Sequence, residues 1–245
     1  MSALIFYTEP EQVLVVTDTL SAAPDGSPLL FTSKAHYVPH LRVIVAGTGI
    51  GGFSVEWALQ VNSRMVLRGI ENLDFHTPGG LRTLWSDYRH EYNLANGMTA
   101  TVYQFGISEE TGQMAAFAYR SANNFESERL GFGIGVKPEC QVPEGNLLDH
   151  IQSMMNEQRA IQATKEPSDR VYIGGEAIAI HLMKDSCTFT RLFEFPDRRA
   201  DEIPSLNHTR GSESHRIGEG RRVDRGCVAR EARRRVDVPP TRRHW

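Results

Sequence analysis

Cysteine is scarce in this 245-residue chain, and the three that it has show no characteristic spacing. Cys140, Cys187 and Cys227 lie too far apart for the short Cys-x-x-Cys spacings that are typical of zinc sites. An odd number also cannot pair completely within one chain, so we expect reduced thiols, as in a cytoplasmic protein. The composition therefore argues against a secreted domain held together by disulfides.

Long apolar runs are missing as well. No stretch approaches the roughly 18 consecutive apolar residues that a membrane-spanning helix needs. The first residues lack the basic region and apolar core of a secretory signal, so export is not expected and a cytoplasmic location is. Because 40% of the 245 residues are hydrophobic, the chain is nevertheless long and apolar enough to build one substantial core.

Lysine is also scarce: the chain has four lysines, and all of them precede residue 208. Residues 208–245 instead hold eleven Arg against five Asp plus Glu, a formal charge of +6, which leaves −9 on residues 1–207. This segment has few apolar residues and no sustained period, so we predict one domain over 1–200 and a disordered tail over 201–245. The tail is either an arm that binds nucleic acid or an accessory extension, and the low specificity of basic runs favours the second.

Three residues near the start, Ser2, Asp18 and Lys34, follow one another at intervals of sixteen. Removal of Met1 would leave Ser2 with a hydroxyl and a free α-amine, whose reference pKa of roughly 7.7–8.0 suits a general base. A lysine ammonium nearby would favour the deprotonated amine, and a carboxylate would hold that ammonium in position. The alternative is that these residues have no catalytic role, because many proteins begin with Met-Ser and one Asp and one Lys at this spacing are not specific.

The pattern around these residues predicts that they meet. Residues 3–8 (ALIFYT) and 13–19 (VLVVTDT) are rich in strand formers and are separated by a turn sequence, which indicates a hairpin. Residues 29–38 form a further extended segment, and this segment carries the lysine. Because a hairpin returns the chain to its start, we expect Asp18 to lie beside Ser2.

These segments resemble the proteasome β-subunit and HslV branch of the N-terminal nucleophile (Ntn) hydrolases. The resemblance covers roughly four-fifths of the chain and rests on Ser2, Val13–Asp18 (VLVVTD), Thr32–Lys34 (TSK) and Leu41–Gly47 (LRVIVAG). It implies that Ser2, Asp18 and Lys34 are catalytic, that the Gly47 amide is the oxyanion donor and that Val45 lines the pocket for the substrate side chain.

The resemblance also implies a peptide or amide substrate and chemistry that needs no metal or organic cofactor. The expected assembly is a homo-oligomer, a ring or a helical array, with an ATP-dependent unfoldase as a partner.

Two departures from the family pattern favour a second hypothesis, a catalytically silent assembly or structural protein of the same fold. The family has a serine in a glycine-rich strand that supports the nucleophile's amine, whereas Ile134 is the nearest residue here. It also has an Asp and a Ser just before a Gly-Gly pair, whereas Ile173 precedes Gly174-Gly175 and Asp169 comes one position too early.

The remaining patterns predict an α+β protein, and the resemblance implies a four-layer αββα sandwich of two antiparallel sheets between helix layers. Consecutive strands joined by tight turns indicate antiparallel pairing. The expected helices cover 51–64, 81–92 and 146–164, and the expected further strands cover 41–46, 99–108, 114–120, 129–136, 171–183 and 188–195.

A third hypothesis comes from Gly47–Gly52 (GTGIGG), which has the spacing of a dinucleotide-binding loop between a strand and a helix. Glu71 lies nineteen residues beyond the last glycine, and residues 65–70 resemble a second strand. This pattern would make the chain a Rossmann oxidoreductase, with the helix N-terminus facing a pyrophosphate. The hairpins before and after the motif argue against it.

Overall fold

The computed structural model describes residues 3–23 and 25–202. Ser2 and almost the whole predicted tail, residues 203–245, lie outside the described residues. The description therefore begins at the residue that follows the expected nucleophile.

The predicted N-terminal hairpin is confirmed. Strand β1 (Leu4–Glu9) pairs antiparallel with β2 (Gln12–Asp18), with Phe6 opposite Val15. Both strands lie inside a five-stranded sheet of order β10-β1-β2-β11-β12, in which every neighbouring pair is antiparallel. The other members of this first sheet are β10 (Gly133–Lys137), β11 (Glu176–Met183) and β12 (Cys187–Glu194).

A second five-stranded antiparallel sheet has the order β5-β6-β7-β8-β9, and a small two-stranded sheet joins β3 to β4. The extended segment expected over 29–38 thus splits between two sheets. The bounds are β3 (Leu20–Ala22), β4 (Pro28–Phe31), β5 (Ala35–Val38), β6 (Val43–Gly49), β7 (Ala100–Ile107), β8 (Met114–Arg120) and β9 (Ser127–Leu130).

Helices α1 (Phe53–Arg64) and α2 (Ile70–Glu91) follow β6, and α3 (Leu147–Ala163) follows β10. Helix α3 begins one residue after the predicted start at 146, and the Asn146 side chain caps it by accepting a hydrogen bond from the Leu148 amide at 3.3 Å. Two short 3₁₀ turns, Ser121–Asn123 and Pro167–Asp169, and a helical stretch over residues 198–202 at the end of the described chain are the remaining elements. None of the helices in the described residues is long and apolar enough to cross a membrane.

Three clusters of buried apolar side chains hold the described elements together. One joins the second sheet to α1 and α2, a second lies between the two five-stranded sheets, and a third joins the first sheet to α3. Trp57, Phe105 and Met155 are representative members, one from each cluster, and each is 1% exposed or less.

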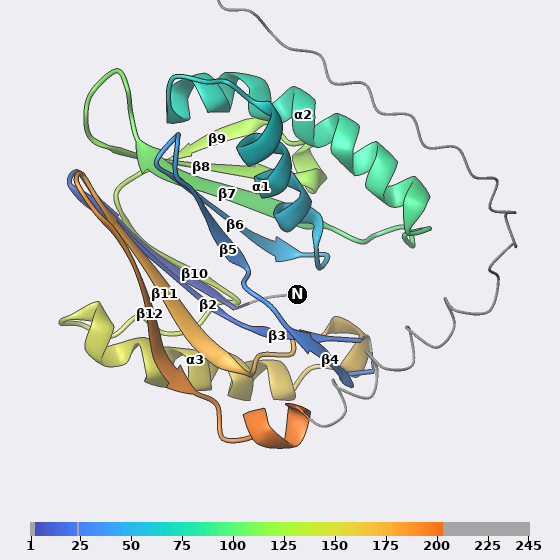
Figure 1. Ribbon diagram of the computed structural model, residues 1–245. Coiled ribbons are helices and arrows are strands. Elements are labelled where there is room, and N and C mark those ends of the chain that lie inside the picture. The colour runs from blue at the N-terminus through green and yellow to red at the C-terminus, as the bar shows by residue number, and fades with distance from the viewer. Residues whose placement is uncertain (1–2, 24, 203–245) are drawn as a thin grey trace, which may run out of the picture.

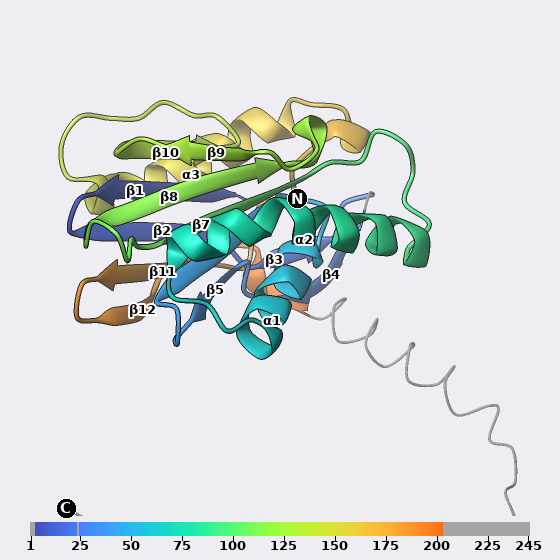
Figure 2. The ribbon, with the colours of Figure 1, turned by 90° about the horizontal axis from the view of Figure 1, so that it is seen from above.

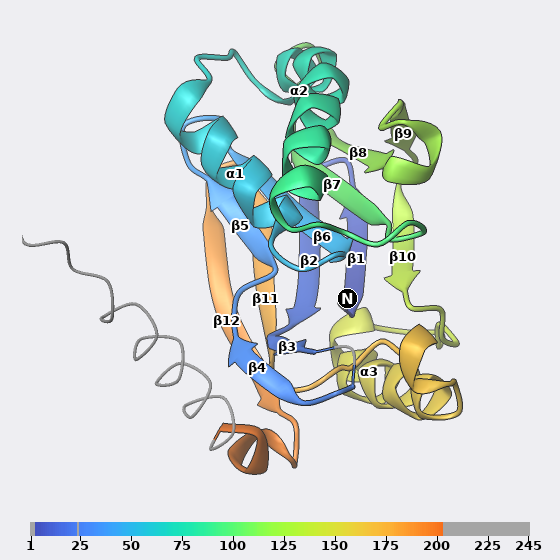
Figure 3. The ribbon, with the colours of Figure 1, turned by 90° about the vertical axis from the view of Figure 1, so that its right-hand side faces the viewer.

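Figure 1 shows α1 and α2 over the second sheet and α3 on the far side of the first, and Figures 2 and 3 agree. The protein is thus a mixed α and β fold with antiparallel sheets, consistent with the expected sandwich.

Two of the expected strands are wrong. Residues 65–70 form no strand, since α2 begins at Ile70, eleven residues before the predicted start. The strand predicted over 129–136 is two strands in different sheets, because β9 pairs with β8 and β10 pairs with β1. The chain crosses between the sheets at Gly131 and Phe132, where two short strands read in sequence as one glycine-rich run.

Candidate functional site

Asp18 and Lys34 form a buried ion pair. Asp18 is the last residue of β2, Lys34 immediately precedes β5, and the two residues are 0% and 7% exposed. The Lys34 Nζ lies 2.8 Å from Asp18 Oδ1 and donates a second hydrogen bond to the Leu20 carbonyl at 2.6 Å. The structure therefore brings together the two charged residues that the sequence pattern selected.

The same carboxylate holds the start of the described chain. The Ala3 amide donates to Asp18 Oδ1 at 2.9 Å, and the Gly174 amide donates to Oδ2 at 3.2 Å. Asp18 thus accepts from three donors that come from the start of the chain, from the lysine and from the loop before β11. A carboxylate taken out of water needs such partners, and this one has them.

Burial is the largest influence on the lysine. It lowers the pKa of Lys34 below its usual value, and the attraction and hydrogen bond of Asp18 offset this in part. The ammonium form is thus held by one carboxylate and one carbonyl in a site that water does not reach freely.

Gly47 lies within β6, and its place requires a glycine. A Cβ added there would come within 2.3 Å of the Ser54 side chain at the start of α1. The Gly47 amide donates to the backbone carbonyl of Lys34 at 3.3 Å, so the predicted oxyanion donor lies beside the backbone of the lysine and already has an acceptor. The oxyanion role of Gly47 stays a prediction.

Val45 is completely buried, at 0% exposure. It belongs to the cluster between the second sheet and α1 and α2, together with Phe53 and Trp57. Its side chain therefore has no solvent-facing surface in the described structure, and its contact with a substrate side chain stays a prediction.

The two departures from the family pattern have clear places. Ile134 lies in β10 opposite Tyr7, is 41% exposed and brings no hydroxyl to the ion pair. Asp169 ends the second 3₁₀ turn and lines a cavity near the start of β1. Among the described residues, neither Ile134 nor Asp169 forms a hydrogen bond or ion pair with Asp18 or Lys34, which is consistent with the silent-protein hypothesis.

The dinucleotide-binding hypothesis is wrong. Strand β6 pairs antiparallel with both of its neighbours, β5 and β7, whereas a dinucleotide fold needs parallel strands joined through a helix. Glu71 lies in the first turn of α2 and pairs with Arg129 through both carboxylate oxygens, so it does not end a strand that faces a ribose. The Gly51 carbonyl accepts from the Tyr88 hydroxyl at 2.6 Å, which fixes the loop against α2.

Sequence reasoning missed two members of the site, Leu20 and Gly174. Both act through the backbone, with the Leu20 carbonyl on Lys34 and the Gly174 amide on Asp18. Side-chain type gives no signal for such a role. In the described residues, no group of three or more His, Cys, Asp or Glu side chains is placed to hold a metal ion.

Comparison with known proteins identifies the fold. No family model matches the sequence, and no curated protein is similar to it. Two similar solved structures have a TM-score of 0.54 and cover 91% of this chain and 100% of their own. One is Anbu (ancestral beta-subunit) from Yersinia bercovieri, at 11% identity, and the other is a Gly-1 mutant of Anbu from Hyphomicrobium sp. strain MC1, at 9%.

The fold is similar to that of Anbu. Anbu is a proteasome-like protein of the Ntn-hydrolase family. The assignment of this chain to the proteasome β-subunit and HslV branch is therefore wrong, because the structural likeness points to Anbu and no family model supports the branch. At such low identity, the likeness to Anbu shows a proteasome-like fold and leaves the chemistry to be tested.

Proposed function

We propose that this protein is an amide hydrolase, a peptidase, whose nucleophile is Ser2 after removal of Met1. The observation that carries the proposal is the hydrogen bond from the Ala3 amide to Asp18, together with the ion pair between Asp18 and Lys34. These contacts tie the residue next to Ser2 to a buried acid–base pair. Activation of an N-terminal hydroxyl needs such a pair close by.

The proposed reaction is an acyl transfer in two steps. The Ser2 hydroxyl attacks the substrate carbonyl, its proton passes to the Ser2 α-amine, and the Gly47 amide stabilises the oxyanion. The carbon–nitrogen bond then breaks, the leaving amine takes the proton, and Ser2 carries the acyl group as an ester. Water hydrolyses the ester and restores the hydroxyl. Lys34 favours the unprotonated amine, and Asp18 holds Lys34.

The proposal extends to architecture and assembly. Residues 1–200 form one four-layer αββα domain, and copies of this domain associate into a homo-oligomer. The three core clusters and the structural likeness to Anbu support the first statement. The second rests on the proteasome-like fold. An ATP-dependent unfoldase remains the proposed partner for folded substrates.

Intact mass combined with covalent labelling tests the proposed chemistry. We expect purified protein to have lost Met1 and to gain one adduct with a peptide epoxyketone, which reacts with an N-terminal nucleophile. The adduct should disappear in Ser2→Ala and persist in Ser63→Ala, an exposed serine of α1. Protein that keeps Met1 and takes no label would contradict the proposal.

The second candidate is a catalytically silent protein of the same fold. It is favoured by the Gly47 amide, which already donates to Lys34, and by Ile134, which leaves the ion pair without a neighbouring hydroxyl. The same labelling experiment separates the two candidates. A full-length mass with no adduct and no peptide cleavage would support the silent protein.

A further inference from the structure

A cavity of about 660 Å³ lies between the two five-stranded sheets, next to the candidate site. Its walls include Thr48 and Gly49, which follow Gly47 directly, and Lys137, which pairs with Leu4 near the start of β1. The end of α3 contributes Gln162 to the same cavity. This volume is typical of sites that hold a few residues or a small ligand.

The cavity lies on the other face of β6 from Val45. Side chains alternate along a strand, and Val45 packs with α1 and α2 whereas Ile44 and Ala46 pack between the two sheets. Thr48 shares the face of Ala46 and lines the cavity. A substrate whose acyl side chain approaches Val45 would therefore place its other side, beyond the scissile bond, against this cavity.

The charged lining carries an excess of positive charge. Lys137, at the end of β10, and Lys165, after α3, are two basic lining residues, and Glu139 and Asp169 are two acidic ones, so these four balance in formal charge. None of these four side chains has an ion-pair partner among the described residues. Arg120, from β8, is the remaining charge.

The Arg120 guanidinium has N–H donors that its ion pair with Glu128 does not use. Its Nη1 pairs with Glu128, a residue of β9 that does not line the cavity. A guanidinium carries five N–H donors, so one carboxylate at Nη1 leaves others for a ligand.

Tyr103 lines the same cavity and offers a second donor near Arg120, because Arg120 is paired with Thr101, two residues before Tyr103 on the same face of β7. The residue is 5% exposed, and burial raises the pKa of its hydroxyl against the opposing effects of Arg120 and of a hydrogen bond with Thr48. The hydroxyl therefore stays protonated and able to donate. A tyrosine hydroxyl beside a guanidinium is a suitable pair for a carboxylate.

We infer that this cavity binds the leaving-group side of the substrate and selects an acidic side chain there, through Arg120 and Tyr103. The inference rests on the proposed hydrolase function. It adds a substrate class to that function, namely peptides with Glu or Asp directly after the scissile bond.

Two measurements on the full-length protein test the inference. The first follows cleavage of peptides that differ only in Glu, Gln or Lys after the scissile bond, with mass spectrometry to locate the cut. We expect kcat/KM to be about tenfold higher for Glu than for Gln, since a hydrogen-bonded charge contributes roughly that much. The preference should fall to near parity in Arg120→Gln, decrease in Tyr103→Phe and persist in Arg82→Gln, an exposed arginine of α2.

The second measures binding of the same Glu and Gln peptides to Ser2→Ala protein by calorimetry, so that it needs no catalysis. Tighter binding of the Glu peptide without any cleavage by wild type would contradict the proposed hydrolase function and support the acidic-side-chain site. Cleavage with no preference for Glu, or with a preference for Lys, would keep the hydrolase and overturn the acidic site. If wild type cleaves no peptide and the Glu and Gln peptides bind equally well, the hydrolase and the acidic site are both overturned. Because Tyr103→Phe removes a single hydroxyl, it keeps the test valid if Arg120→Gln does not fold.

Discussion

At the scale of single residues, Asp18 is the junction of the candidate site. It joins the start of β1, the Lys34 ammonium and the Gly174 loop through three hydrogen bonds, and it is fully buried. Removal of one partner from a buried ion pair leaves an uncompensated charge. The pair should therefore be strongly coupled in stability as well as in catalysis.

We predict that Asp18→Asn and Lys34→Met each lower the free energy of unfolding by about 3–5 kcal/mol, as single losses from buried pairs do. The double variant should lose less than the sum of the two, because it leaves no buried charge without a partner. Urea unfolding of the four proteins measures this coupling. If Asp18→Asn fails to fold, Lys34→Met and the double variant still give the comparison.

Additive losses, within about 0.5 kcal/mol, would contradict the coupling. Lys184→Met, a change in the turn between β11 and β12, serves as the control and should leave stability nearly unchanged. Covalent labelling of the same proteins separates stability from catalysis, because a folded Lys34→Met protein should also lose the epoxyketone adduct.

The sequence was sufficient to select Asp18 and Lys34 because a hairpin and a return strand have recognisable patterns. It could not select Gly174 or the Leu20 carbonyl, since backbone groups carry no residue signature. It also could not show that the Gly47 amide already donates to Lys34, which depends on how β5 and β6 pair.

At the scale of elements, α2 shows most clearly where sequence reasoning failed. Pro78, Gly79 and Gly80 are helix breakers in isolation, so the sequence suggested a helix that starts after them. In the fold, a Cβ at position 80 would come within 2.6 Å of the Trp57 ring, so a glycine is needed for α1 and α2 to approach. Tertiary packing outweighs local propensity here.

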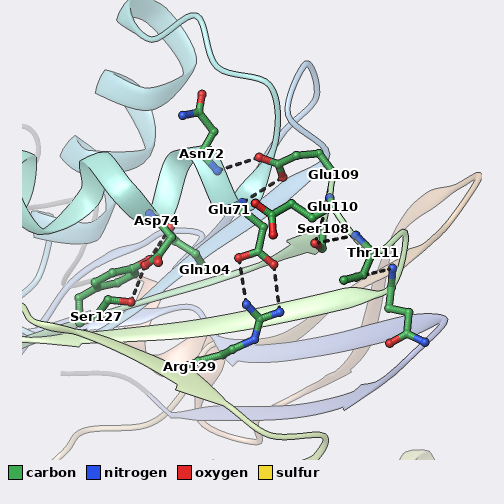
Figure 4. Close-up of polar contacts among 12 residues, drawn as sticks. Glu71, Asn72, Asp74, Gln104, Ser108, Glu109, Glu110, Thr111, Ser127 and Arg129 are labelled. Carbon is green, nitrogen blue, oxygen red and sulfur yellow. Dashed lines mark hydrogen bonds and ion pairs between the residues drawn. The ribbon is translucent and has the colours of Figure 1, made fainter.

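The N-terminus of α2 receives its cap from a distant turn. Gly69 precedes the helix and has no side chain to offer, and the Glu109 carboxylate accepts from the Glu71 and Asn72 amides at 3.0 and 2.7 Å. Figure 4 shows this carboxylate beside the first turn of α2, with Glu110 next to it. A negative group at this place satisfies free amides and the positive end of the helix dipole.

We predict that Glu109→Gln lowers the free energy of unfolding by about 1 kcal/mol at neutral pH, which is typical of a lost charged cap. Burial opposes ionisation of Glu109, but its backbone hydrogen bonds and Arg68 prevail and hold its pKa below the usual 4.5. The stabilisation is therefore present above pH 4.5 and is lost as the pH falls through the lowered pKa. Urea unfolding across this range should show the gap between wild type and Glu109→Gln closing on acidification.

The neighbouring change Glu110→Gln is the matched control, because no cap to α2 comes from that side chain in the described structure. Its stability should follow that of wild type at every pH. An equal loss in both variants would mean that the charge of the turn matters rather than the cap.

At the scale of the whole molecule, the fold was more predictable than the family. The alternation of hairpins and helices is enough to indicate antiparallel sheets with helices beside them. The switch of the chain from β9 in one sheet to β10 in the other has no sequence signal, because glycine fits a strand, a crossover and a turn equally well. Motifs of one to seven residues likewise could not decide the family, and the similar solved structures are only 9–11% identical to this chain.

The exposed apolar side chains of α1 and α2 bear on the proposed assembly of the protein. Three large apolar side chains on α1, α2 and their connection face solvent: Leu59 is 55% exposed, Val66 100% and Phe75 80%. Burial of such groups between copies would stabilise an oligomer, and fully burying one of them contributes roughly 1.5–3 kcal/mol. We predict that the wild-type protein is an oligomer in light scattering and that Phe75→Glu shifts it toward the monomer.

Phe132→Glu, a change at the 55% exposed residue of the crossover between β9 and β10, is the control and should leave the mass unchanged. A monomer at all concentrations would refute the proposed assembly, and dissociation by Phe132→Glu rather than Phe75→Glu would move the interface to the crossover.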